Sequence, residues 1–155
     1  MKKIIIASIC VLAGVAVHAE DVGDVNTAFK LIGPSHKIVV EVFDDPRVAG
    51  VSCYLSRAKT GGIAGALGVA EDKAEASVAC RQVGPIQFNG AIPKKEDVFT
   101  ERASFLFKHI RVVRMADQKR NVLVYLVYSD RVIEGSPQNS VTAVPVPANQ
   151  PIPIK

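Results

Sequence analysis

The sequence predicts a mainly β protein, a single antiparallel β-sandwich or open-barrel-like domain of six to eight strands. Several short runs are rich in β-branched residues or alternate between apolar and polar residues, which is the period of a strand. Helical periodicity is almost absent, and clusters of Gly, Pro and Asp separate the runs. Many short strands between such turns are typical of antiparallel sandwiches and barrels.

The first 19 residues are predicted to be a secretory signal peptide. Two lysines are followed by a long apolar run, and Val17-His18-Ala19 resembles a signal-peptidase site, so cleavage is expected after Ala19. No second apolar run reaches the roughly 18 to 20 residues that span a bilayer. We therefore expect a secreted protein with no stable membrane insertion after signal cleavage.

The remaining chain is expected to form one β-rich domain over residues 20–144. Removing residues 1–19 takes away two of the 19 basic residues and none of the 15 acidic ones, which leaves a net charge of +2. A charge this small gives no electrostatic reason to expect binding to nucleic acid.

Two strands are predicted in the first half of the domain. Residues 37–43 are rich in β-branched side chains and end at Asp44-Asp45-Pro46, a turn in which an Asp side chain binds nearby backbone. Residues 51–57 alternate, which places Val51, Cys53 and Leu55 on one inward face.

The next segment is harder to interpret. Residues 61–68 contain four glycines, which predicts an ordered loop or one short helix near residues 61–72. Residues 71–79 are rich in Ala, Glu and Lys and are compatible with a helix, whereas residues 77–83 fit a strand beside Cys53. We favour the strand.

The second half predicts a hairpin and a tail. Residues 103–115 form a long mixed strand in which the adjacent Val112 and Val113 suggest a bulge. Residues 121–128 are apolar on both faces, as in a central strand, and residues 117–121 supply the turn between the two. Four of the nine prolines fall in residues 145–155, which predicts a flexible tail.

Cys53 and Cys80 are the only cysteines after the leader, and in an oxidising compartment they are expected to form a disulfide. This bond would close a loop of 28 residues and stabilise the fold by about 3.6 kcal/mol in the chain-entropy model. Its loss should lower stability without affecting any mechanism.

One region combines positive charge with flexible backbone amides. Arg57, Lys59, Thr60, Gly61 and Gly62 are candidate ligand-binding residues, because converging amides and an arginine can hold a small anion. The alternative is a tight loop whose basic side chains are simply solvated. The partner would be a small anionic ligand or an envelope protein.

Weaker candidates are His36, Asp44, Asp45 and Asp130. With Ser56 as a nucleophile they leave open an enzyme that acts on cell-envelope material, which requires His36 or Lys59 within hydrogen-bond reach of one of these groups. The histidines lack further ligands at metal-binding spacing, and no cofactor motif is present. We therefore expect a non-enzymatic protein that binds a ligand or an envelope partner. A structural or chaperone-like envelope component is the third possibility, recognisable by an exposed apolar patch or an unpaired sheet edge.

The chain resembles the CreA family of secreted bacterial proteins. The resemblance covers nearly the whole mature chain, in residues 29–34, 36–41, 43–46, 53–54, 56–62, 80–86, 128–130 and 134–137. It implies a periplasmic protein of Gram-negative bacteria of uncharacterised function, encoded in some members beside a sensor kinase and a response regulator. It implies no reaction and no catalytic residue, and residues 147–155 depart from the family pattern.

Overall fold

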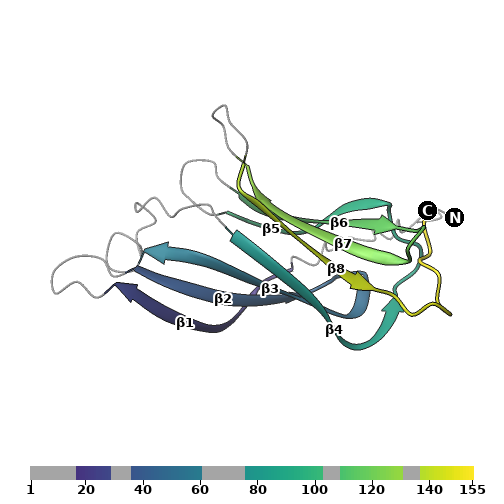
Figure 1. Ribbon diagram of the computed structural model, residues 1–155, viewed down its shortest axis with the longest axis horizontal. Helices are drawn as coiled ribbons and strands as arrows, with labels where there is room; N and C mark the ends of the chain where they lie inside the picture. The colour runs from purple at the N-terminus through teal and green to yellow at the C-terminus, as the bar shows by residue number, and fades with distance from the viewer. Residues whose placement is uncertain (1–16, 29–35, 61–75, 103–108, 131–136) are drawn as a thin grey trace, which may run out of the picture.

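The computed structural model describes residues 17–28, 36–60, 76–102, 109–130 and 137–155, which form two layers of β-sheet (Figure 1). The predicted all-β class is confirmed: eight strands make two antiparallel sheets of four, and no helix occurs in these segments. No helix long and apolar enough to cross a membrane is therefore found among them. The short helix expected near residues 61–72 lies outside the described residues.

The first sheet is an antiparallel meander in chain order. It consists of β1 (Glu20–Ala28), β2 (His36–Asp44), β3 (Val48–Thr60) and β4 (Ala76–Phe88). The strands predicted over residues 37–43 and 51–57 are confirmed as β2 and β3, and the strand beside Cys53 is confirmed as β4. The polar β1 carries no apolar alternation, which is why the sequence did not reveal it.

The second sheet repeats this topology with β5 (Lys95–Arg102), β6 (His109–Asp117), β7 (Val122–Ser129) and β8 (Asn139–Pro145). The predicted hairpin is confirmed, since β6 and β7 pair across a turn that ends at Asn121. Asn121 has a φ of 53°, a left-handed conformation that Asn tolerates better than most residues. β7 lies between β6 and β8, as expected of a central strand.

The bulge expected at Val112 and Val113 lies instead on the neighbouring strand. Val113 pairs with Asp97 and Val112 pairs with Phe99, so the extra residue is Val98 of β5. The two valines on β6 are both buried, but their pairing with β7 is regular. The prediction of a bulge near Val112 and Val113 was therefore right in position, but the bulged strand is β5 and not β6.

The core lies between the two sheets, where inward side chains of both meet. It includes Leu55 of β3, Val78 of β4, Val112 of β6 and Val127 of β7. β4 packs against β7 and β8 of the other sheet (Figure 1). Phe43 of β2 stacks on Phe99 of β5 with ring centroids 4.5 Å apart, which joins the sheets on the opposite side of the core.

The C-terminal segment is part of the domain, which corrects the prediction of a flexible tail after Val144. Val146 and Ile152 are buried in the core, and Ile154 bridges to Ile92. The side-chain amide of Asn121 donates to the carbonyls of Val146, Pro147 and Gln150, and its Oδ1 accepts from the backbone N–H of Ile152. The segment is not extended throughout, since residues 147–150 form a turn in which the backbone N–H of Gln150 donates to the carbonyl of Pro147. It docks because Val146 and Ile152 are buried in the core.

Candidate functional site

The disulfide between Cys53 and Cys80 is present, and both cysteines are fully buried. The two residues are directly paired in register between β3 and β4. The bond therefore joins neighbouring strands in the core, just beyond which β3 carries the candidate residues Arg57 and Lys59.

Arg57 occupies an inward position of β3. Inward side chains alternate along this strand through Val51, Cys53 and Leu55, and the next in the series is Arg57, whose side chain is only 6% exposed. A charge in such a place has to be paired, because desolvating it alone is costly. The arginine at the inward end of an apolar series is therefore the feature that organises this region.

Two carboxylates, one from each sheet, pair with Arg57. Its Nη2 donates to Glu101 Oε1 of β5 at 2.6 Å. The same nitrogen lies 2.6 Å from Glu41 Oε2 of β2, an ion pair that lacks hydrogen-bond alignment. Arg57 thus connects the sheets at the strand ends near Thr60 and Arg102.

Lys59 joins the same cluster by donating to Glu41 Oε1 at 2.7 Å. Burial of Glu41 acts to raise the pKa of its carboxyl, but the hydrogen bond from Lys59 and the charges of Lys59 and Arg57 outweigh it, so this pKa lies below its usual range. Glu41 therefore stays ionised. Two cations and two carboxylates make the Arg57 cluster, defined as Arg57, Lys59, Glu41 and Glu101, close to neutral overall.

A pocket of about 360 Å³ adjoins this cluster. Its wall includes Arg57 and a set of hydroxyl and amide side chains, namely those of Ser56, Ser77, Gln138, Asn139 and Ser140. The hydroxyls of Ser77 and Ser140 lie 3.3 Å apart and join β4 to β8. The pocket thus lies where the two sheets meet and offers both donors and acceptors.

Within the described part of the chain, Arg57 Nε is buried and has no hydrogen-bond partner. Buried polar atoms without a partner are uncommon in folded proteins, and each calls for an explanation such as a water or a ligand. The carboxylates use Nη2, which leaves Nε–H as a donor for an additional group.

The other predicted residues of this site are only partly placed. Thr60 ends β3 and pairs in register with His36 at the start of β2. Gly61 and Gly62 lie outside the described residues.

Asp45 is not at this site but in a second, deeper cluster. Its Oδ1 accepts from the backbone N–H groups of Arg47 and Val48, which forms the turn that the sequence predicted. The same carboxylate also accepts from Arg114 Nη1 at 2.6 Å and from the Tyr125 hydroxyl at 2.8 Å. Asp45 therefore ties the turn after β2 to β6 and β7 of the other sheet.

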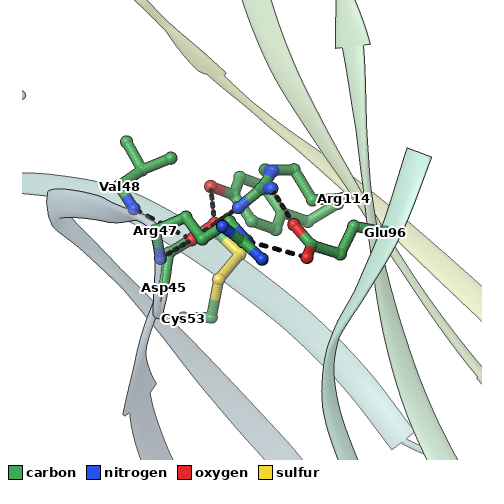
Figure 2. A network of polar contacts seen from close by, with 8 residues as sticks. Asp45, Arg47, Val48, Cys53, Glu96 and Arg114 are labelled. Carbon is green, nitrogen blue, oxygen red and sulfur yellow. Dashed lines mark hydrogen bonds and ion pairs between the residues drawn. A yellow bond between two sulfur atoms is a disulfide. The ribbon is translucent and has the colours of Figure 1, made fainter. Parts of the chain in front are cut away.

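Glu96 completes this cluster from β5. It accepts from Arg114 Nη2 through one oxygen and from Arg47 Nε at 2.8 Å through the other. Figure 2 shows Asp45 and Glu96 on either side of Arg114, with Cys53 close by. We call Asp45, Arg47, Glu96, Arg114 and Tyr125 the Arg114 cluster.

The centre of the Arg114 cluster is buried, whereas its outer members Arg47 and Glu96 are 40% and 22% exposed. The side chains of Arg114 and Asp45 are both 0% exposed. Burial, followed by the charge of Asp45 and the hydrogen bond to it, raises the pKa of Tyr125, so its hydroxyl stays protonated as a donor. Such an arrangement can hold the two sheets together.

The remaining weak candidates lie apart from one another. Asp44 accepts a hydrogen bond from the Ser52 hydroxyl at 2.5 Å. Asp130 pairs with Arg111 of β6 at 2.7 Å, and its carboxylate lies 4.0 Å from His109. His36 is exposed at the start of β2. Among the described residues, no hydrogen bond links His36 or Lys59 to the candidate nucleophile or acids, which are Ser56, Asp44, Asp45 and Asp130. The convergence of side chains that the enzyme hypothesis requires is therefore not seen among these residues.

Sequence reasoning missed Glu41, Glu101, Glu96, Arg114 and Tyr125. A usable signal existed for Glu41 and Arg114, and it is the same signal that Arg57 carries. Glu41 lies between inward Val39 and Phe43, Arg57 follows Leu55, and Arg114 follows Val112, each at the strand period. A charged residue at an inward position predicts a buried ion pair, but its partner on another strand becomes visible only in the fold.

Comparison with known proteins identifies the family. A family model described as "CreA protein" matches residues 22–149. Protein CreA of Escherichia coli strain K12 is 54% identical over 149 residues, which cover 94% of this chain and 95% of that protein. The same identity and coverage are found for Protein CreA of Escherichia coli O6:H1 and of Escherichia coli O157:H7. No solved structure matches the chain. The chain therefore belongs to the CreA family, as the resemblance in its sequence indicated.

Proposed function

We propose that this protein is a non-enzymatic periplasmic binding protein that holds a small polar ligand in the pocket beside Arg57. The observation that carries the proposal is the buried Arg57 Nε, which has no hydrogen-bond partner in the described part of the chain although Arg57 lines a pocket. A ligand oxygen that accepts from this N–H would remove the cost of leaving it unpaired.

The surroundings of Arg57 indicate the class of ligand. Because Glu41 and Glu101 already balance Arg57 and Lys59, the site has little excess positive charge with which to hold a dianion. The serine hydroxyls and the amides of Gln138 and Asn139 suit a ligand with several polar atoms. A singly charged carboxylate with hydroxyl or amide groups, as in fragments of cell-envelope material, meets both conditions.

Export to the periplasm is part of the proposal. The pattern of residues 1–19 supports it, as does the Cys53–Cys80 bond, because disulfides persist in oxidising compartments. The intact mass of protein recovered from the periplasmic fraction of a Gram-negative host should correspond to a chain that begins at Glu20. A full-length chain retained in the cytosol would contradict this part.

The binding site can be tested with a thermal-shift screen of the purified protein against monocarboxylates, sugars and peptidoglycan fragments. A ligand that prefers the folded state must raise the melting temperature. Arg57→Lys keeps the ion pairs but removes the Nε–H, so it should abolish the shift produced by a hit while the protein stays folded.

Asn139→Ala, on the pocket wall, should weaken the same hit, whereas Asn89→Ala, exposed and outside the pocket lining, should leave it unchanged. A shift that all three variants retain would exclude this pocket. Turnover of an envelope substrate that a point mutation abolishes would overturn the non-enzymatic proposal.

A further inference from the structure

A second hollow, of about 550 Å³, lies against β2, β3 and β4. None of the described residues that line it also lines the Arg57 pocket. Its lining includes Val42 and Asp44 of β2, Ser52 and Tyr54 of β3 and Val83 of β4. We call this the Tyr54 groove. Its walls are polar and apolar in nearly equal parts, with the valines on one hand and the Asp44–Ser52 hydrogen bond on the other.

The outer positions of β2 are unusually apolar for a sheet face that meets solvent. Inward Val39, Glu41 and Phe43 alternate with Ile38, Val40 and Val42, which face the other way. The outer face of an antiparallel sheet is normally polar. Tyr54, paired with Val42, and Val83 are both exposed, and Val83 is 58% exposed. The groove therefore lies in an apolar strip that no other described strand covers.

The end of the predicted leader forms one wall of this groove. Val17 lines it, and Val17 and Ala19 pack against the hydrophobic core. β1 begins at Glu20, the first residue after the expected cleavage site. Cleavage after Ala19 would therefore vacate the positions of Val17 and Ala19 beside the groove and leave β1 intact.

Beside the groove, the end of β2 extends beyond its pairing with β1. Glu20 pairs with Val42, so the last two residues of β2, Phe43 and Asp44, extend past the first residue of β1. An extended peptide can use such a free strand edge while its side chains fill adjacent pockets.

We propose that the Tyr54 groove, vacated by signal cleavage, binds an extended segment of an envelope protein through a branched apolar side chain that takes the place of Val17. The inference shares with the proposed function only the removal of residues 1–19 and does not depend on the Arg57 pocket. The occupant is a peptide segment because, in the uncut chain, the place it would take is held by the apolar side chain of Val17, which lines the groove and packs against the core.

The test uses the protein purified from the periplasm, with its N-terminus established by intact mass, and a synthetic peptide of residues 14–19, Gly-Val-Ala-Val-His-Ala. In an NMR titration the peptide should shift the amide signals of Val42, Tyr54 and Val83 in a saturable manner. Replacing Val17 by Asp in the peptide should weaken binding at least about tenfold, since the anchoring side chain is lost.

Matched variants of the protein locate the site. Val83→Asp should weaken peptide binding at least about tenfold, whereas Val141→Asp, at a position 63% exposed on β8 of the other sheet, should leave it unchanged. Circular dichroism checks that both variants fold.

Three results would overturn the proposal. They are the absence of saturable binding, an equal loss in the two variants, and a dimer that Val83→Asp dissociates, which would mean that a second copy fills the groove. A mature chain that retains residues 17–19 would show that the groove is never vacated, and this readout is independent of any result at the Arg57 pocket.

Discussion

The Arg57 and Arg114 clusters use the same chemistry in two different settings. Each arginine pairs with one carboxylate of its own sheet and one from the other. Arg57 pairs with Glu41 and Glu101, and Arg114 pairs with Glu96 and Asp45. The stacked pair Phe43 and Phe99 separates the two clusters. Phe43 lies between Glu41 and Asp45 in the chain, and Phe99 lies between Glu96 and Glu101.

The two clusters differ in how far their carboxylates are exposed to solvent and in how many hydrogen-bond donors surround Asp45. Asp45 accepts two backbone N–H groups, an arginine and a tyrosine, in a place with no solvent access. Around Arg57, by contrast, Glu101 is 38% exposed and a pocket adjoins the pair. An arginine that pairs with two carboxylates therefore lies in the interior in one cluster and beside a pocket in the other.

The largest expected effect is that of Arg114→Met. It leaves Asp45 and Glu96 without their shared cation in the interior, which should lower the free energy of unfolding by about 3–5 kcal/mol in urea denaturation. Arg120→Met is the control, because Arg120 is 71% exposed and pairs with Asp117, three residues away, so its change should stay within about 0.5 kcal/mol. A small effect at Arg114 would mean that the cluster is not the internal tie described above.

Arg57→Met should cost less, about 1–3 kcal/mol, since Glu101 can regain water and Lys59 continues to pair with Glu41. The same denaturation experiment measures it. If this variant is destabilised as much as Arg114→Met, the two clusters do not differ in the way proposed here.

Tyr125→Phe tests whether the donors around Asp45 matter individually. The change removes the hydroxyl that donates to Oδ2, but the same oxygen keeps Arg114 Nη1 at 2.8 Å, so a loss of about 1–1.5 kcal/mol is expected. Because Phe fills the same space, a loss above about 3 kcal/mol would indicate disrupted packing rather than one missing hydrogen bond.

The smallest effect is a change in the acid dependence of stability through Glu41. Its pKa is lower in the folded protein than the ordinary value of 4.5, so its ionisation stabilises the fold above that pH, and this contribution is lost as the pH falls further. Glu41→Gln should therefore flatten the decrease of melting temperature with falling pH below about 4.5. An unchanged acid profile would show that Lys59 and Arg57 do not hold this carboxylate ionised.

Several features of the fold followed from the sequence, because they depend on local pattern. The alternation through Val51, Cys53 and Leu55 predicted which face of β3 is buried, and the run at residues 121–128 predicted the central β7. Of the candidate site, Arg57 and Lys59 were identified and do lie together, paired with a common carboxylate. The polar β1 and the docked C-terminal segment were not identified, since neither carries a periodic signal of its own.

By itself the sequence determined the all-β class, the disulfide and the family, because strand period, cysteine count and matching motifs are properties of the chain read in order. Only the tertiary structure decided which charges meet. Arg57 is 44 residues from Glu101, and Asp45 is 69 residues from Arg114. Such pairs form because two separate meanders pack face to face, so that a buried charge at an inward strand position lies within reach of carboxylates from both sheets.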